Sequence, residues 1–256
     1  MPKLVILGSA HAVPDQRHEN THMILCGSER IILVDCPGNP VVRLRQVGID
    51  PLQVTDLILT HFHPDHVSGV SLFLLAVWLL GRQEPLNIYG LDETIDRVKQ
   101  MMELFNWREW PGFYPVHFNT METREFAPVL HSSDITITAS ATRHMIPSVA
   151  LRFEFQESHQ AIVYSSDTGP SAEVARLASD VEILIHEAAG PGPGHSSAAQ
   201  AGEIARQAHV KNLILIHYDP NVDLVALAAN ASASFSGPVR LAEDFMIIEL
   251  PYQPTM

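Results

Sequence analysis

The sequence has few cysteines, few lysines and no long apolar run. Cys26 and Cys36 are its only cysteines, so there is no disulfide framework and a reducing compartment is expected. The longest nearly unbroken apolar stretch, Leu72 to Leu80, has nine residues, well short of the ~20 that span a bilayer. The N-terminal apolar run has only four residues, too few for a secretory signal. We therefore expect a cytoplasmic protein with no membrane partner.

Positive charge is also scarce. The 256 residues contain 16 Lys+Arg against 29 Asp+Glu, which gives a net charge of −13. Such a chain repels polyanions on average, which disfavours a dedicated nucleic-acid scaffold. The 14 histidines stand out instead, because histidine is the commonest metal ligand and carries protons near neutral pH.

Short β-rich runs alternate with helical patterns, which predicts an α/β fold. No linker, composition step or repeat divides the chain, so one domain over residues 1–256 is expected. The predicted strands are Leu4–Leu7, Met23–Cys26, Ile31–Val34, Leu57–Thr60, Ile135–Thr138, Val149–Phe155, Ile162–Tyr164, Ile183–Ile185, Leu213–Ile216 and Met246–Leu250. The predicted helices are Pro40–Val47, Val67–Leu80, Glu93–Phe105, Ser171–Ala178, Ser197–Ala208 and Leu224–Ala233.

Two segments depart from this average pattern. Between Val67 and Leu80 only Ser68 and Ser71 are polar, so a helix there is apolar all round and must be covered on nearly every side, in part by a second subunit. Residues 105–118 hold six of the chain's 18 aromatic side chains. Two interpretations stay open for that segment: a satellite core under a long loop, and a substrate lid or subunit contact.

A dense group of ligand-type side chains follows the apolar run Leu57–Thr60. The next six residues read His61-Phe62-His63-Pro64-Asp65-His66. Residues two apart point the same way in an extended chain, so His61 and His63 can hold one cation. Past the turn at Pro64, Asp65 and His66 can face a second. A single histidine is more often structural, but four such side chains in six residues predict metal binding.

This pattern resembles the metallo-β-lactamase superfamily, whose signature is His-x-His-x-Asp-His, and the resemblance continues through His144, Asp167 and His217. It implies a four-layer αβ/βα sandwich with two mixed β-sheets and a metal site at the sheet ends. It also implies two divalent ions. The implied ligands are His61, His63 and His144 for one ion and Asp65, His66 and His217 for the other, with Asp167 bridging them. Nitrogen and carboxylate ligands suit Zn²⁺, our first choice, and also Mn²⁺ or Fe²⁺. His63 stands where the oxygen-reducing di-iron branch has glutamate, which disfavours redox chemistry.

Within the superfamily, the chain most resembles ribonuclease Z and its relatives. Beyond the first motif, the resemblance rests on His144-Met145-Ile146-Pro147-Ser148, Ser165-Ser166-Asp167-Thr168-Gly169-Pro170, His186-Glu187-Ala188 and Gly194-His195-Ser196-Ser197-Ala198. It implies phosphodiester hydrolysis by a hydroxide held between two cations. Asp65 is then both ligand and general base, and His195, oriented by Glu187, donates a proton to the leaving alkoxide.

Several residues keep a second interpretation. His195 can simply precede the serine that caps a helix. His186 is either a core histidine or a support for the site. Asp35 is either a support for the ligand histidines or a turn-forming residue. The remaining histidines match no motif and are treated as structural or solvated: His11, His18, His22, His117, His131, His159 and His209.

One feature of ribonuclease Z is missing. Its tRNA-gripping arm lies between the positions of His144 and Asp167, which are only 167 − 144 = 23 residues apart here. With three lysines in the chain, tRNA is not the expected substrate. The leading hypothesis is a homodimeric phosphodiesterase for a small or short phosphodiester, such as a cyclic nucleotide. The alternatives are a lactone, ester or thioester hydrolase of the same superfamily, and a metal-stabilised binding protein without turnover.

Overall fold

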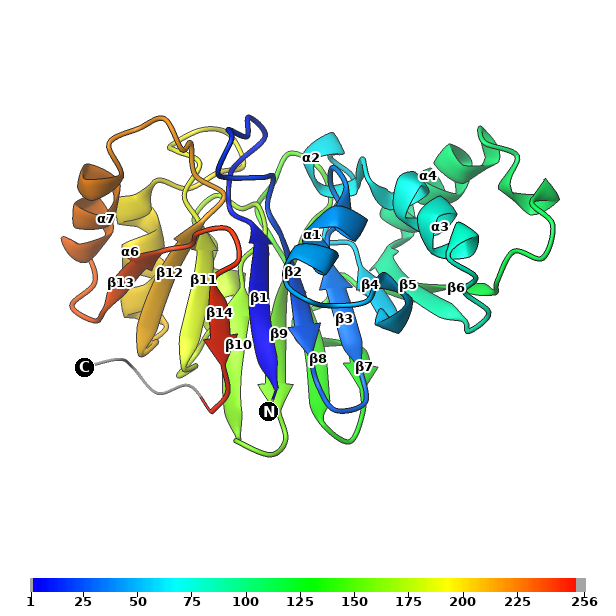
Figure 1. Cartoon of the computed structure of the whole chain (residues 1–256). Coiled ribbons are helices and arrows are strands. Elements are labelled where there is room, and N and C mark those ends of the chain that lie inside the picture. The colour runs from blue at the N-terminus through cyan, green and yellow to red at the C-terminus, as the bar shows by residue number, and fades with distance from the viewer. Residues whose placement is uncertain (1, 252–256) are drawn as a thin grey trace.

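The computed structural model describes residues 2–251, and the remaining six residues of the expected single domain lie outside that range. Two seven-stranded sheets lie face to face, with helices on their outer sides (Figure 1). The first sheet has the order β14-β1-β2-β3-β4-β5-β6. Its strands are β1 (Lys3–Gly8), β2 (His22–Cys26), β3 (Ile31–Val34), β4 (Asp56–Ile58), β5 (Leu86–Leu91), β6 (Val116–Met121) and β14 (Ile247–Glu249).

The second sheet has the order β13-β12-β11-β10-β9-β8-β7. Its strands are β7 (Ala127–His131), β8 (Ile135–Ala141), β9 (Val149–Phe155), β10 (Gln160–Tyr164), β11 (Ile183–Glu187), β12 (Asn212–Ile216) and β13 (Val239–Leu241). Each sheet is mixed. β3 to β6 pair in parallel and so do β10 to β13, while the other neighbours are antiparallel.

The helices cover the outer faces of the two sheets. The first sheet carries α1 (Pro40–Gln46), α2 (Pro64–Val67), α3 (Val70–Leu79) and α4 (Asp92–Glu103), with the 3₁₀ turns η1 (Pro51–Gln53) and η2 (Trp107–Glu109). The second sheet carries α5 (Ala172–Leu177), α6 (Ala198–Gln207) and α7 (Leu224–Ser232). None of the helices between residues 2 and 251 is long and apolar enough to span a bilayer.

The main core lies between the sheets. Alternate residues of each strand point inward, as a pleated strand requires, so Ile6 and Met23 of one sheet belong to the same buried cluster as Leu151 and Phe153 of the other. The residues between them point outward and pack under the helices. This packing of side chains fixes the two sheets relative to each other.

The predicted helix Val67–Leu80 is interrupted, because α2 ends at Val67 and α3 begins at Val70. A Cβ atom on Gly69 would lie 2.7–2.8 Å from the carbonyl oxygens of Cys36, Pro37 and Gly38. Glycine is therefore required where the chain turns between the helices. The helix is also less covered than expected, because Leu72 is 44% exposed and Leu79 is 70% exposed.

The aromatic segment 105–118 is for the most part a satellite core. Trp107 and Tyr114 are buried in the cluster under the first sheet's helices, and Trp110, Phe113 and Phe118 pack against it. Phe105 is the exception, with 52% of its surface exposed. Four strands were missed by sequence analysis, namely β5, β6, β7 and β13. The last three are sheet edges or near them, where alternating exposure leaves no continuous apolar run.

Candidate metal centre

The predicted ligand residues all follow strands that end at the same edge of the molecule. His61 and His63 come after β4, His144 after β8, Asp167 after β10 and His217 after β12. The carboxyl ends of β8, β10 and β12 point the same way, because two antiparallel pairings separate β8 from β10 and parallel pairings join β10 to β12. The Val149 N–H donates to the Thr60 carbonyl at 3.2 Å, which joins this edge to the first sheet.

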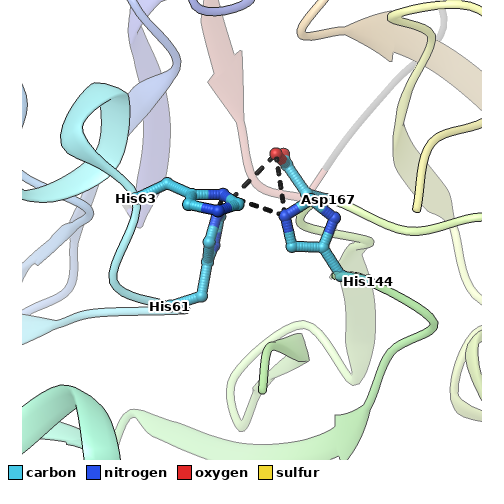
Figure 2. Close-up of side chains that lie close together, drawn as sticks. All are labelled: His61, His63, His144 and Asp167. Carbon is cyan, nitrogen blue, oxygen red and sulfur yellow. Dashed lines mark hydrogen bonds and ion pairs between the residues drawn. The ribbon is translucent and has the colours of Figure 1, made fainter. Parts of the chain in front are cut away.

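The first group consists of three imidazole rings and one carboxylate (Figure 2). His63 Nδ1 lies 3.2 Å from His61 Nε2 and 3.0 Å from His144 Nε2. The Oδ2 atom of Asp167 lies 3.7 Å from His61 Nε2 and 3.8 Å from His144 Nε2. Three nitrogen atoms and one oxygen atom therefore converge, although they come from two sheets.

The second group consists of Asp65, His66 and His217. Asp65 Oδ2 lies 3.4 Å from His217 Nε2 and 3.8 Å from His66 Nε2. The Oδ1 atom of Asp167 is 3.5 Å from each of the same two nitrogens. One oxygen of Asp167 thus faces the first group and the other oxygen faces the second.

The chemistry of these side chains fits divalent metal ions. In each group the candidate ligand atoms lie within 4.8 Å of one another. His66 Nε2 and Asp167 Oδ1 are buried without a hydrogen-bond partner, which is costly unless something else satisfies them. Burial lowers the pKa of His61 well below its usual value, so this ring is neutral and offers a lone pair. The predicted divalent metal site therefore has a suitable set of donors, and the role of each ligand stays a prediction.

A buried carboxylate holds two of these rings in place. Asp35 is fully buried, and its Oδ1 atom accepts a hydrogen bond from the Thr60 N–H at 2.8 Å. Its Oδ2 atom lies 2.8 Å from His66 Nδ1. The Thr60 hydroxyl lies 3.0 Å from Asp35 Oδ2 and 3.0 Å from His61 Nδ1. Both rings therefore turn their Nε2 atoms toward the centre. A hydrogen bond to the other ring nitrogen commonly orients metal-binding histidines in this way. The geometry favours the supporting role over a simple turn residue.

The ring of His144, which belongs to the first group, is held by the backbone. His144 Nδ1 lies 2.8 Å from the Gly194 carbonyl oxygen. A Cβ atom on Gly194 would lie 2.8 Å from the same nitrogen, and the residue has a φ of +77°, so glycine is needed at this contact. Asp35, Ser166 and His217 also have positive φ values, between 51° and 59°. Such conformations cluster at functional sites.

His195 and Glu187 form a pair beside the second group. Glu187 is fully buried, and its Oε1 atom lies 3.0 Å from His195 Nδ1 and accepts a hydrogen bond from the Ser196 N–H, also at 3.0 Å. The hydrogen bond to Glu187 raises the pKa of His195. The His195 ring stacks on that of His217 at 5.7 Å and 13°. The arrangement suits a proton donor at the edge of the centre.

Three further observations concern this pair and its neighbours in the chain. His195 also has a ring nitrogen within 4.8 Å of ligand atoms of Asp167 and His217, so its geometry is compatible with a ligand as well. Ser197 caps α6 with a reciprocal capping box to Gln200, so the helix-cap interpretation holds for Ser197 alongside either role of His195. His186 is fully buried, and its Nδ1 lies 2.8 Å from the Glu187 carbonyl oxygen, outside the ligand groups.

Sequence reasoning missed the position of His11, which it treated as structural or solvated. The His11 ring lies 6.5 Å from that of His217, edge to face at 78°. His11 follows β1, which runs parallel to β3 and β4 through two antiparallel pairings. Its place after a strand that ends at the metal-binding edge was the available signal, and no motif marks it.

Known proteins resemble the chain along its whole length. A family model described as "Anti-Pycsar protein Apyc1" matches residues 2–238. A ribonuclease Z from Methanothermobacter thermautotrophicus is 26% identical over 98% of this chain and 97% of its own. The solved metallo-β-lactamase fold protein YhfI from Bacillus subtilis matches with a TM-score of 0.80 and 22% identity, covering 97% of this chain and all of its own.

Human short-form tRNase Z, ELAC1, matches with a TM-score of 0.78 and 22% identity, over 97% of this chain and 99% of its own. At 22% identity, these solved structures show a likeness of the fold alone. With the two mixed sheets, they confirm the predicted metallo-β-lactamase-like α/β architecture.

The position of Asp35 leads to a prediction about metal retention. Asp35→Asn keeps the size of the side chain but loses the charge that orients His66, so we expect metal affinity to fall by roughly 10–100-fold. Competition with a chelator, followed by measurement of bound metal, provides the test. Asp56→Asn is the matched control, because Asp56 is an equally buried carboxylate bonded to Thr55 and Asn87 elsewhere. Equal metal affinity in Asp35→Asn and wild type would contradict the supporting role.

Proposed function

The chain belongs to the family described as anti-Pycsar protein Apyc1, and from this premise we propose that it is a two-metal phosphodiesterase acting on a small or short phosphodiester. The observation that carries the proposal is the placement of Asp167 between two groups of ligand-type side chains. The likeness to ribonucleases Z over nearly the full chain confirms the prediction that this chain is a ribonuclease Z-like member of the metallo-β-lactamase superfamily. It also confirms the prediction of a metal-dependent hydrolase of the phosphodiesterase kind.

Two ions at this centre would be held by the seven predicted ligands, and Zn²⁺ remains our first choice. One set would be His61, His63 and His144, and the other Asp65, His66 and His217, with Asp167 shared. When bound, such ions activate water and neutralise charge on a phosphoryl group. The histidine nitrogens and carboxylate oxygens at both positions support this assignment.

The chain's own residues would handle the protons. Asp65 is 15% exposed, so the attacking water can reach its carboxylate, which would accept a proton from it. His195 carries a raised pKa and lies at the edge of the centre, where it would donate a proton from Nε2 to the leaving oxygen. Glu187 would orient it, because Nδ1 is engaged by the carboxylate at 3.0 Å.

The expected substrate is small because residues 2–251 form no long arm beside the centre. The residues between His144 and Asp167 form the hairpin of β9 and β10, joined by a short turn. The net charge of −13 would also repel a long polyanion. These features support a cyclic nucleotide or a similar phosphodiester over precursor tRNA.

We further propose that the protein forms a homodimer through the exposed side of α3 and the start of the aromatic segment. Leu79, Leu104 and Phe105 are 70%, 82% and 52% exposed. A hollow of about 180 Å³ lies beside them, lined by Ser71, Leu72, Leu75, Phe105 and Trp110. Exposed apolar surface of this kind is typical of a protein contact.

The first prediction from the proposed function concerns Asp65. Zn²⁺- or Mn²⁺-loaded protein should hydrolyse bis(p-nitrophenyl) phosphate, and Asp65→Ala should lower turnover roughly 10²–10⁴-fold, because both a ligand and a proton acceptor are lost. Asp96→Ala on α4, where the side chain is 69% exposed, should retain full turnover. If metal-loaded wild type is inactive on phosphodiesters, lactone, ester and thioester substrates become the favoured class.

The second prediction concerns His195. His195→Ala should slow a phosphodiester with an alkoxide leaving group far more than one with a p-nitrophenolate leaving group, because only the poor leaving group needs a proton. Bound metal should stay unchanged, and His131→Ala, an exposed histidine on β7, serves as the control. Equal losses on both substrates would count against a proton donor, and lost metal would indicate a ligand.

The third prediction concerns assembly. Light scattering at micromolar concentration should give the mass of a dimer for wild type and of a monomer for Leu79→Glu combined with Phe105→Glu, because a buried unpaired carboxylate is costly. Val225→Glu is the matched control, since Val225 is 81% exposed on α7, at the far side of the molecule (Figure 1). If wild type has the mass of a monomer, the proposed homodimer is wrong.

A further inference from the structure

The loop between β1 and β2 is bonded directly to the chain segment that carries His217. The loop rises over the same end of the molecule as α2, which carries Asp65 and His66 (Figure 1). The His11 N–H donates to the Tyr218 carbonyl at 3.1 Å, and the His217 N–H donates to the Ser9 carbonyl at 2.8 Å. Asn20 Nδ2 donates to the His11 carbonyl at 2.7 Å. His11 is therefore held beside His217 by its backbone.

The ring of His11 has a defined donor atom. The Val13 N–H donates to His11 Nδ1 at 3.2 Å, so this nitrogen carries the lone pair and the proton of the neutral ring lies on Nε2. Within residues 2–251, no hydrogen-bond partner of Nε2 is found. The side chain is partly exposed, and its ring lies edge to face with that of His217 at 6.5 Å.

A neutral imidazole in this state suits a substrate oxygen better than a metal ion. Its free nitrogen bears a hydrogen, and its other nitrogen is already engaged by the backbone. His11 is also absent from the three groups of side chains that could hold an ion. The two carboxylates of the candidate centre, Asp65 and Asp167, face the ring nitrogens of the ligand groups, so an uncharged donor at its edge would pair with an acceptor that arrives with the substrate.

We propose that His11 contacts the substrate by donating a hydrogen bond from Nε2 to a non-bridging phosphoryl oxygen on the His217 side of the centre. This inference rests on the proposed phosphodiesterase function and assigns it a further residue. Phosphoryl oxygens carry the charge that grows during hydrolysis, and a donor fixed in advance is worth most there. His195 and His11 would then serve different oxygens: the leaving oxygen and a non-bridging one.

The test compares three variants of the full-length, metal-loaded protein on bis(p-nitrophenyl) phosphate. His11→Ala removes the donor and should lower kcat by about 10–100-fold, the usual range for a hydrogen bond to a charged group. His11→Gln keeps an N–H donor on a side chain of similar reach and should recover part of the loss. Bound metal should equal that of wild type in both.

The matched control is His18→Ala in the same loop. His18 bonds to Asp15 at 3.0 Å and packs edge to face on Tyr218 at 6.0 Å, so it stabilises the loop and does not face His217. If His11 only supported the loop, His18→Ala would lower kcat as much as His11→Ala and His11→Gln would not recover.

Each outcome has one meaning. A lower kcat in His11→Ala, recovery in His11→Gln, unchanged metal and an active His18→Ala would support the contact. Unchanged kcat in His11→Ala, equal losses in the two alanine variants, or loss of metal from His11→Ala would overturn it. Inactivity of the metal-loaded wild type would instead contradict the proposed function itself, before any variant is compared.

Discussion

The structure depends most on one buried carboxylate that is shared by two groups of side chains. Asp167 directs Oδ2 at His61 and His144, and it directs Oδ1 at His66 and His217. Burial alone would raise the pKa of Asp167, but the neighbouring His217 and His66 outweigh it and hold this pKa well below its usual value. The carboxyl group is thus ionised in an interior where charge is costly unless paired. Positive charge on both sides, whether protons or metal ions, is what makes that position tenable.

The surrounding fold serves to hold the rings around this carboxylate. Asp35 fixes His66 directly and His61 through Thr60. The Gly194 carbonyl fixes His144, and Glu187 fixes His195. Each of these four rings therefore has one nitrogen held by a hydrogen-bond partner and the other left for chemistry. One nitrogen of each of these rings positions the ring, and the other nitrogen is available at the centre.

The sequence predicted the fold class well, and the structure brings the predicted ligand residues together at one edge. Local signals indicated His61 to His66 and the central strands, whereas His144, Asp167 and His217 were expected from the family resemblance. Their role as ligands stays a prediction. The spacing from His61 to His66 places four ligand-type side chains on one strand end, and apolar runs mark the central strands around them. Short edge strands such as β13 were missed because half of each faces solvent. The break at Gly69 depends on three carbonyls supplied by residues 36–38, and the contact of His11 with His217 joins positions about 200 apart in the chain. Neither could be predicted without the packed structure.

The centre takes its side chains from both sheets, so its assembly depends on the contact between the two sheets. His61, His63, Asp65 and His66 belong to the first sheet, while His144, Asp167 and His217 belong to the second. Neither sheet alone brings together the donors of the first group or those of the second group. The complete set of donors exists only after the two sheets have docked through the core between them. A metal ion bound by either group would therefore connect the two sheets, and its binding free energy would stabilise the interface between them.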